Sequence, residues 1–163
     1  MGYLVGIDTG TSATKAVLID EGGQVRSEAS VEYPLDQPRN GWAEQDPERW
    51  WDAAVSAVRG VLGRAGVAGA EVDAVGLSGQ MHGLVILDEA GRCLRPAILW
   101  CDQRTDEECA WLTNTVGLEN LYRWTGNPAL PGFTAPKLLW LRRHEPQVYL
   151  RLKTVLLPKD YVR

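Results

Sequence analysis

The first third of the chain alternates between apolar and polar residues with the period of two that is typical of β-strands. The alternation covers residues 4–7, 13–19 and 24–33, and turn-forming segments separate the three runs. The segment Asp20-Glu21-Gly22-Gly23 suits a tight hairpin turn, because glycine supplies the positive φ that such turns require. The pattern therefore predicts a meander of three strands with one covered face.

A change of period after residue 45 predicts a long helix. Asp46 suits the N-cap position, and Pro47 suits the first helical position. The helix is expected to run to about residue 65, because apolar residues recur there at spacings of three and four. The residues predicted to pack on the sheet are Trp51, Ala54, Val55, Val58, Val61, Leu62 and Ala65.

The rest of the chain mixes short strands with helices. Residues 72–78, 84–88 and 97–101 are predicted as strands that continue the first sheet. The segment Thr105-Asp106-Glu107-Glu108 is a capping-box pattern, which predicts a helix to about residue 116. Thr134 suits the cap of a helix that ends near His144, before Glu145-Pro146. Residues 153–157 favour one more strand, and residues 159–163 favour the start of a helix in which the chain ends.

Composition and charge narrow the class of protein. The chain has 163 residues, 45% of them hydrophobic and 23% charged, which is typical of one globular domain. With 17 Lys and Arg against 21 Asp and Glu, the net charge is -4, so we expect no nucleic-acid partner. The sequence shows neither a membrane span nor a signal peptide, so we expect no membrane partner and a cytoplasmic location. Cys93, Cys101 and Cys109 are expected to be reduced thiols.

The run Gly6-Ile7-Asp8-Thr9-Gly10-Thr11-Ser12 places a carboxylate at the end of a strand, followed by a turn that contains glycine and hydroxyl groups. Such a turn can direct backbone N–H groups and hydroxyls at a polyphosphate, while Asp8 holds Mg²⁺ directly or through water. It is not a Walker A loop, because the turn leads into another strand and not into a helix. An ordinary hairpin turn would use similar residues, so the residues alone leave both interpretations open.

The run Ser78-Gly79-Gln80-Met81-His82-Gly83 follows an apolar strand and must lie at the edge of a sheet. The amide of Gln80 and the imidazole of His82 can hydrogen-bond the hydroxyls of a polyol, and the glycines permit close approach of the backbone. The pattern favours a sugar site. A histidine that only stabilises a strand connection is the alternative interpretation.

The run Trp100-Cys101-Asp102-Gln103-Arg104 places an aromatic ring, a carboxylate and a guanidinium at another strand end. Trp100 can cover the apolar face of a sugar, while Asp102 and Arg104 bind its hydroxyls. A core tryptophan beside a surface ion pair would use the same residues, and this interpretation also stays open.

In this order along the chain, the three motifs resemble the N-terminal lobe of the FGGY carbohydrate kinases. The resemblance runs nearly from end to end, and Gln80-Met81-His82-Gly83 is most similar to the form found in members that phosphorylate D-xylulose. Members that act on glycerol carry an Arg-Glu pair at that point, and members that act on gluconate usually carry Ala-Met-His. Two further matching stretches are Gly41-Trp42-Ala43-Glu44-Gln45-Asp46-Pro47-Glu48 and Leu157-Pro158-Lys159-Asp160-Tyr161.

The resemblance implies a fold and a reaction. The fold would be an actin-like, ribonuclease-H-like α/β lobe over residues 1–163, with a mixed sheet flanked by helices. The reaction would be the transfer of the γ-phosphoryl group of ATP to the C5 hydroxyl of D-xylulose, giving D-xylulose 5-phosphate. The implied roles are Mg²⁺ and phosphate organisation for Asp8, ATP binding for Gly10, Thr11 and Ser12, and sugar contact for Met81, His82 and Trp100. The expected sugar-binding set also includes Gln80, Asp102 and Arg104, from the chemistry of the motifs themselves.

Two departures from the family pattern bear on this expectation. Cys101 stands where these members usually have Asn, which removes a hydrogen-bonding amide near the sugar. In the family, the general-base Asp and the second, adenosine-binding lobe lie beyond the position of Arg163, so we expect a truncated lobe that is inactive alone. Another FGGY kinase, or a short sugar-binding or partner-binding protein without catalysis, remain the alternatives. The oligomeric state also stays open, with a homodimer as one option.

Overall fold

The computed structural model describes residues 2–163, which form two compact units. The first unit contains the residues up to Leu35, then Asp46–Met81 and Pro158–Arg163. The second unit contains Asp36–Gln45 and His82–Leu157. Each unit is described by itself below.

The first unit is built on a mixed sheet of four strands in the order β3-β2-β1-β5. The predicted meander is confirmed, because β1 pairs antiparallel with β2, and β2 pairs antiparallel with β3. Strand β5 pairs with β1 in the parallel direction. Gly23 has the expected positive φ of 78° in the hairpin between β2 and β3. The strands are β1 (Tyr3–Thr9), β2 (Ala13–Asp20), β3 (Val25–Glu32) and β5 (Val72–Gly79).

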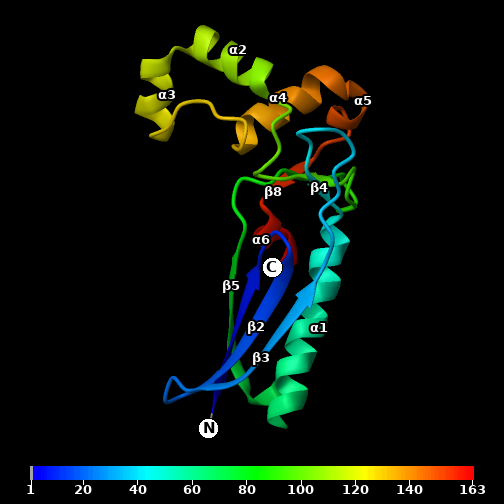
Figure 1. Ribbon diagram of the computed structural model, residues 1–163, viewed down its shortest axis with the longest axis vertical. Coiled ribbons are helices and arrows are strands. Elements are labelled where there is room, and N and C mark those ends of the chain that lie inside the picture. The colour runs from blue at the N-terminus through cyan, green and yellow to red at the C-terminus, as the bar shows by residue number, and fades with distance from the viewer. Residues whose placement is uncertain (1) are drawn as a thin grey trace. The chain divides into compact units, whose positions relative to one another are not determined.

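The helix α1 (Pro47–Ala65) lies along β2 and β3 (Figure 1). Its predicted start is confirmed, because the Asp46 side chain accepts a hydrogen bond of 3.1 Å from the Glu48 backbone N–H. The predicted packing face is wrong in part, since Trp51 is 48% exposed. The apolar stripe of this helix is wider than its buried side, so the period alone did not fix which of the apolar residues are buried. The buried residues are Pro47, Trp50, Ala53, Ala54, Ala57 and Val61.

Two short helical elements complete the first unit. The 3-10 turn η1 (Gly69–Glu71) leads into β5. The helix α6 (Pro158–Val162), predicted as the start of a helix, packs against α1 and β5. Its Val162 is buried, and the Tyr161 hydroxyl donates a hydrogen bond to the carboxylate of Glu48.

The second unit holds two small antiparallel sheets. Strand β4 (Glu44–Gln45) pairs with β7 (Ala97–Ile98), and β6 (Val85–Leu87) pairs with β8 (Thr154–Leu156). The prediction that β6 and β7 continue the first sheet is therefore wrong, although β5 does join it. Short, fully buried apolar runs carry no periodic signal that could assign them to one sheet or another.

Helices dominate the remainder of the second unit (Figure 1). They are α2 (Asp106–Val116), α3 (Leu118–Thr125), α4 (Thr134–His144) and α5 (Pro146–Tyr149). Part of α4 packs against the small sheets, because Trp140 and Leu141 form one buried cluster with Leu84, Ile86 and Ile98.

The predicted helices α2 and α4 are confirmed, and Thr105 takes the expected N-cap position of α2, but neither Thr105 nor Thr134 makes the expected capping hydrogen bond. The Thr105 side chain makes no capping hydrogen bond and donates instead to the carbonyl of Pro131 at 3.3 Å. Thr134 is the first helical residue after the N-cap Phe133, and its hydroxyl donates to the carbonyl of His82 at 3.2 Å. In both cases an acceptor distant in the sequence takes the hydroxyl that a local cap would have used.

Two findings bear on the expected surroundings of the protein. Within residues 2–163, no helix is both long enough and apolar enough to cross a membrane. Cys93, Cys101 and Cys109 are free thiols, as predicted. Burial raises the pKa of the Cys101 thiol and that of the Cys109 thiol above the ordinary value for cysteine.

Candidate phosphate- and sugar-binding site

Asp8 is placed by the register of the sheet in the first unit. It lies opposite Lys15 of β2 and beside Ser78 of β5, on the face of the sheet that α1 does not cover. Its side chain is exposed and makes no hydrogen bond or ion pair with another residue in the range 2–163. A carboxylate in this position is available to a hard cation, which prefers oxygen ligands.

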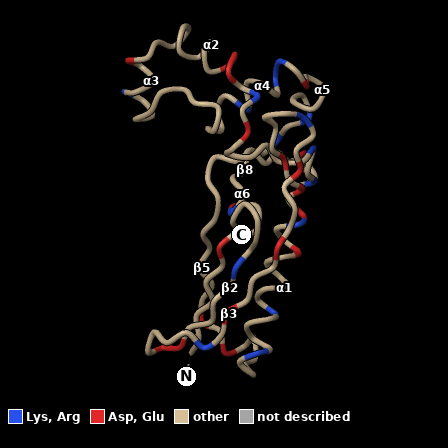
Figure 2. Tube along the Cα trace, in the orientation of Figure 1, with Lys and Arg blue, Asp and Glu red and all other residues tan. Residues whose placement is uncertain are grey.

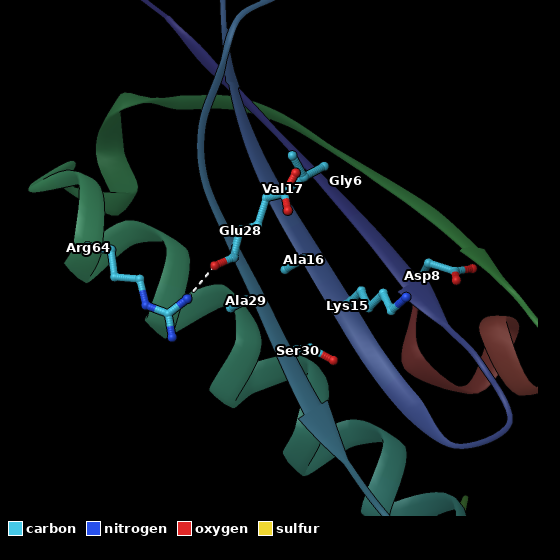
Figure 3. A pocket seen from close by; sticks show the side chains of 9 residues that line it. All are labelled: Gly6, Asp8, Lys15, Ala16, Val17, Glu28, Ala29, Ser30 and Arg64. Atoms are coloured by element: carbon cyan, nitrogen blue, oxygen red, sulfur yellow. Dashed lines mark hydrogen bonds between the residues drawn. The ribbon is translucent and has the colours of Figure 1, made fainter.

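A hollow of about 480 Å³ lies in the first unit beside Asp8 (Figure 3). Two cross-strand rows line it: Asp8, Lys15 and Ser30 form one, and Gly6, Val17 and Glu28 form the other. Figure 3 shows the Lys15 side chain reaching toward Asp8, and Arg64 donating to the backbone carbonyl of Glu28. The hollow therefore has both a carboxylate and an ammonium group at one end.

The loop between β1 and β2 is fixed by donors from elsewhere in the first unit. The carbonyl of Gly10 accepts hydrogen bonds from the Tyr33 hydroxyl at 2.7 Å and from the Gln80 amide at 3.2 Å. The carbonyl of Ser12 accepts a hydrogen bond of 3.1 Å from the Tyr33 backbone. Burial raises the pKa of Tyr33, so its hydroxyl remains a donor at neutral pH. These three hydrogen bonds restrain the backbone of the turn.

Gln80 joins the first motif to the second. Its amide bonds the Gly10 carbonyl, and its backbone N–H donates to the Thr9 carbonyl at 2.8 Å. Gly79 permits this approach, because a Cβ atom there would lie 2.9 Å from the Thr9 carbonyl oxygen. Gln80 was expected to bind sugar, and in the structure its amide donates to the backbone of the loop between β1 and β2.

Met81 and His82 follow Gln80 at the point where the chain passes from the first unit to the second. Met81 is 61% exposed. Within the second unit, His82 has a positive φ of 65°, which is uncommon for a residue other than glycine. Its ring lies 4.7 Å from that of Phe133, and its carbonyl accepts hydrogen bonds from Thr134 and Lys137.

Trp100 lies just beyond β7, and about half of its surface is exposed. The nearby Asp102 is fully buried, and its carboxylate accepts hydrogen bonds from the backbone of Ala43 at 2.6 Å and of Arg104 at 2.9 Å. Two further bonds come from the Arg104 guanidinium, at 2.7 and 2.9 Å. The expected hydroxyl-binding carboxylate is therefore bonded to the protein itself.

Arg104 is also engaged by the protein. Its Nη2 lies 2.7 Å from carboxylate oxygens of both Asp102 and Glu44, and its guanidinium carbon lies 3.6 Å from the ring centre of Trp42. Arg95 adds further bonds to Glu44 and Glu145. Acidic and basic positions meet around β4 in Figure 2. The group is a buried ion-pair network of the second unit.

Tyr33 and Lys137 are two residues that the sequence analysis did not select. A lysine in a helix is normally expected at the surface, yet Lys137 is fully buried. A signal was present, because Lys137 shares a helix face with Trp140 and Leu141 at the spacings i+3 and i+4. For Tyr33 the only sequence signal is its place at the end of a strand.

Comparison with known proteins identifies the class to which this arrangement belongs. The model of the N-terminal domain of the FGGY family of carbohydrate kinases matches residues 3–163. The chain belongs to this family. It is 44% identical over 163 residues to the xylulose kinase of Bacillus subtilis (strain 168), covering 100% of this chain and 32% of that protein.

Solved structures agree with this assignment. The chain matches a xyloylose kinase from Brucella ovis with a TM-score of 0.93 and 42% identity, over 99% of this chain and 33% of that one. It matches a gluconate kinase from Lactobacillus acidophilus with a TM-score of 0.91 and 32% identity, over 99% of this chain and 32% of that one. The expected actin-like, ribonuclease-H-like fold class is confirmed. The chain spans about a third of the length of these relatives.

Proposed function

We propose that this chain is the N-terminal lobe of an ATP-dependent sugar kinase that converts D-xylulose to D-xylulose 5-phosphate. The observation that carries the proposal is the 44% identity to a xylulose kinase along the entire chain. The exposed Asp8 beside a fixed glycine-containing turn, and the exposed Met81 and Trp100, support it. The proposal includes a cytoplasmic location, which fractionation of the source cells tests.

In the proposed site, Asp8 holds Mg²⁺ directly or through water. The residues present fit this ion, because the carboxylate has no other partner among residues 2–163 and the neighbouring Thr11 and Ser12 carry further oxygen ligands. Bound there with ATP, the ion neutralises charge on the phosphates.

The loop of Gly10, Thr11 and Ser12 binds the phosphates of ATP in this proposal. The Gly10 N–H already donates to the Ala13 carbonyl at 3.0 Å, so the N–H groups and hydroxyls of the rest of the turn are the ones proposed for the phosphate oxygens. Tyr33 and Gln80 support the loop by bonding the Gly10 carbonyl, so that the turn does not have to be ordered when ATP binds.

In this proposal the side chains of Met81, His82 and Trp100 contact the ketose. The imidazole of His82 hydrogen-bonds a hydroxyl, and Met81 and Trp100 cover apolar parts of the sugar. We assign Gln80, Asp102 and Arg104 a supporting part, because their side chains bond to the protein. This narrows the set of direct sugar contacts expected from the sequence.

The reaction forms a bond between the C5 oxygen of the sugar and the γ-phosphorus. It breaks the bond from that phosphorus to the oxygen that leaves with ADP, and the hydroxyl proton passes to a base. In the family that base lies beyond the position of Arg163. The role of this lobe in the reaction is to position both substrates and to stabilise the charge on the phosphates.

The test uses the full-length gene product with ATP and three acceptors: D-xylulose, glycerol and gluconate. We expect kcat/KM to be highest for D-xylulose. His82→Ala should lower kcat/KM for D-xylulose, and His144→Ala is the matched control, because His144 is the other histidine of the chain. Preference for gluconate or glycerol would contradict the proposed substrate while leaving the kinase class intact.

A further inference from the structure

Lys137 of α4 is a buried charge without an ion-pair partner. Its side chain is 0% exposed, and no carboxylate in the range 2–163 forms an ion pair with it. Its ammonium donates instead to two backbone carbonyls, that of His82 at 2.9 Å and that of Gly132 at 2.5 Å. Burial lowers the pKa of Lys137 to about 8. A buried charge is costly unless other groups compensate it, and here the two carbonyls supply hydrogen bonds to the ammonium.

Both carbonyls belong to segments next to proposed sugar contacts. The first is the carbonyl of His82 itself, which also accepts a hydrogen bond from Thr134. The second belongs to Gly132, whose backbone lies against Trp100: a Cβ atom at Gly132 would be 2.9 Å from the Trp100 carbonyl oxygen. One ammonium group therefore joins the segment of His82 to the segment that backs Trp100.

We propose that Lys137, assisted by Thr134, is a positioning residue that sets His82 and Trp100 for contact with the ketose. The inference rests on the proposed sugar-kinase function. His82 has a strained backbone with a φ of 65°, and such a conformation persists only where neighbouring groups hold it. The two donors to its carbonyl supply that restraint, and the ring of Phe133 packs against the imidazole at 4.7 Å.

The geometry separates this role from one in ATP binding. All the groups that Lys137 bonds lie in the second unit, whereas Asp8, Gly10 and Tyr33 lie in the first. Loss of the ammonium should therefore weaken sugar binding and leave ATP binding nearly unchanged.

The main experiment is steady-state kinetics of the full-length gene product with Lys137→Met, which keeps the length of the side chain and removes its donors. We expect KM for D-xylulose to rise roughly tenfold to a hundredfold, as for the loss of a charged hydrogen bond, with KM for ATP changed by less than about twofold. Lys153→Met, at an exposed lysine of the same unit, is the control and should match the wild type. An unchanged KM for the sugar, or an equal rise for both substrates, would overturn the inference.

A second pair of variants covers the case in which Lys137→Met does not fold. Thr134→Val removes the hydroxyl at nearly constant volume, and Thr134→Ser retains it. We expect a several-fold rise in KM for D-xylulose for the valine variant and a value near the wild type for serine. Equal values for the two variants would count against the restraint of His82.

A third readout does not depend on the sugar. The chain has two histidines, so the NMR signals of their rings are simple to assign. In the 163-residue chain, Lys137→Met and Thr134→Val should shift the His82 ring signals and leave those of His144 in place. If D-xylulose is not a substrate, a shift still supports the restraint of His82 and only the proposed function fails. If the His82 signals do not shift in these variants, the inference itself is overturned.

Discussion

The proposed phosphate loop of the first unit and the proposed sugar contacts of the second are held in different ways. Asp8 takes its place from the register of long strands, between Lys15 and Ser78. Within the second unit, the strands next to His82 and Trp100 have only two or three residues, and the buried side chains of Lys137 and Asp102 bond to the backbone near them. Backbone pairing between strands therefore positions Asp8, whereas side-chain interactions surround His82 and Trp100.

The difference predicts which substitutions change activity and which change the free energy of unfolding. An exposed side chain on a backbone frame can be changed without loss of the frame. A buried charge in a network cannot, because its partners are left without compensation. Substitutions of exposed side chains such as Asp8 should thus affect mainly activity, and substitutions in the buried ion-pair network of the second unit should affect mainly folding.

The largest effect is expected for Asp8→Asn. Replacing the proposed Mg²⁺ ligand should lower kcat of the full-length gene product at least about a thousandfold. The free energy of unfolding should barely change, because this carboxylate has no partner in residues 2–163. Kinase assays over a range of Mg²⁺ concentrations measure the first effect, with the exposed Asp52→Asn as control. Activity near that of the wild type would remove Asp8 from the site.

Arg104→Met should give the opposite result. It leaves the fully buried Asp102 without its guanidinium partner, and we expect a loss of roughly 4 kcal/mol in the free energy of unfolding. Urea unfolding of the 163-residue chain, followed by tryptophan fluorescence, measures it. The exposed Arg59→Met is the control. A loss below about 1 kcal/mol would show that the network adds little to stability.

Lys137 should make stability depend on pH in the alkaline range. Its pKa is about 8 in the folded chain against an ordinary value of 10.5, so the unfolded chain binds more protons between these values. Its contribution to stability should therefore rise from about pH 8 to about pH 10.5, by up to about 3 kcal/mol. Unfolding of the wild type and of Lys137→Met across this range isolates the effect, because Tyr33 and the thiols titrate in both. If the free energies of unfolding of the two proteins depend on pH in the same way, the lowered pKa of Lys137 is contradicted.

The smallest effect is expected for Tyr33→Phe. It removes the hydroxyl that donates to the Gly10 carbonyl at 2.7 Å. A loss of about 1 kcal/mol would raise KM for ATP roughly fivefold. KM for D-xylulose should stay the same. Tyr3→Phe in β1 serves as the control, and a rise for the sugar alone would show that the loop does not serve the nucleotide.

The first unit was largely predictable from the sequence. Its strands alternate over seven or eight residues, and Asp46-Pro47 marks the start of α1 with local capping chemistry. These signals depend on near neighbours in the chain, which the sequence shows directly. Only the buried side of α1 was misjudged at Trp51, since the adjacent Trp50 fits the same periodic pattern.

The second unit was less predictable, because distant partners decide its structure. Thr105 and Thr134 have the right type for helix caps, yet their hydroxyls bond to Pro131 and His82. The same holds for the candidate site. Residue types after strands point to Asp8 and Trp100, but the bonds from Gln80 to Gly10 and from Ala43 to Asp102 span 70 and 59 residues.

The buried network of Asp102 and Arg104 has a consequence for genetic screens. A screen that scores growth on a sugar would group Arg104 with Asp8, since a substitution of either should abolish growth. The expected reasons differ: loss of Arg104 should deplete the protein in the cell through chaperones and proteases, whereas loss of Asp8 should leave normal amounts of an inactive protein. Immunoblots of the same colonies would tell the two groups apart.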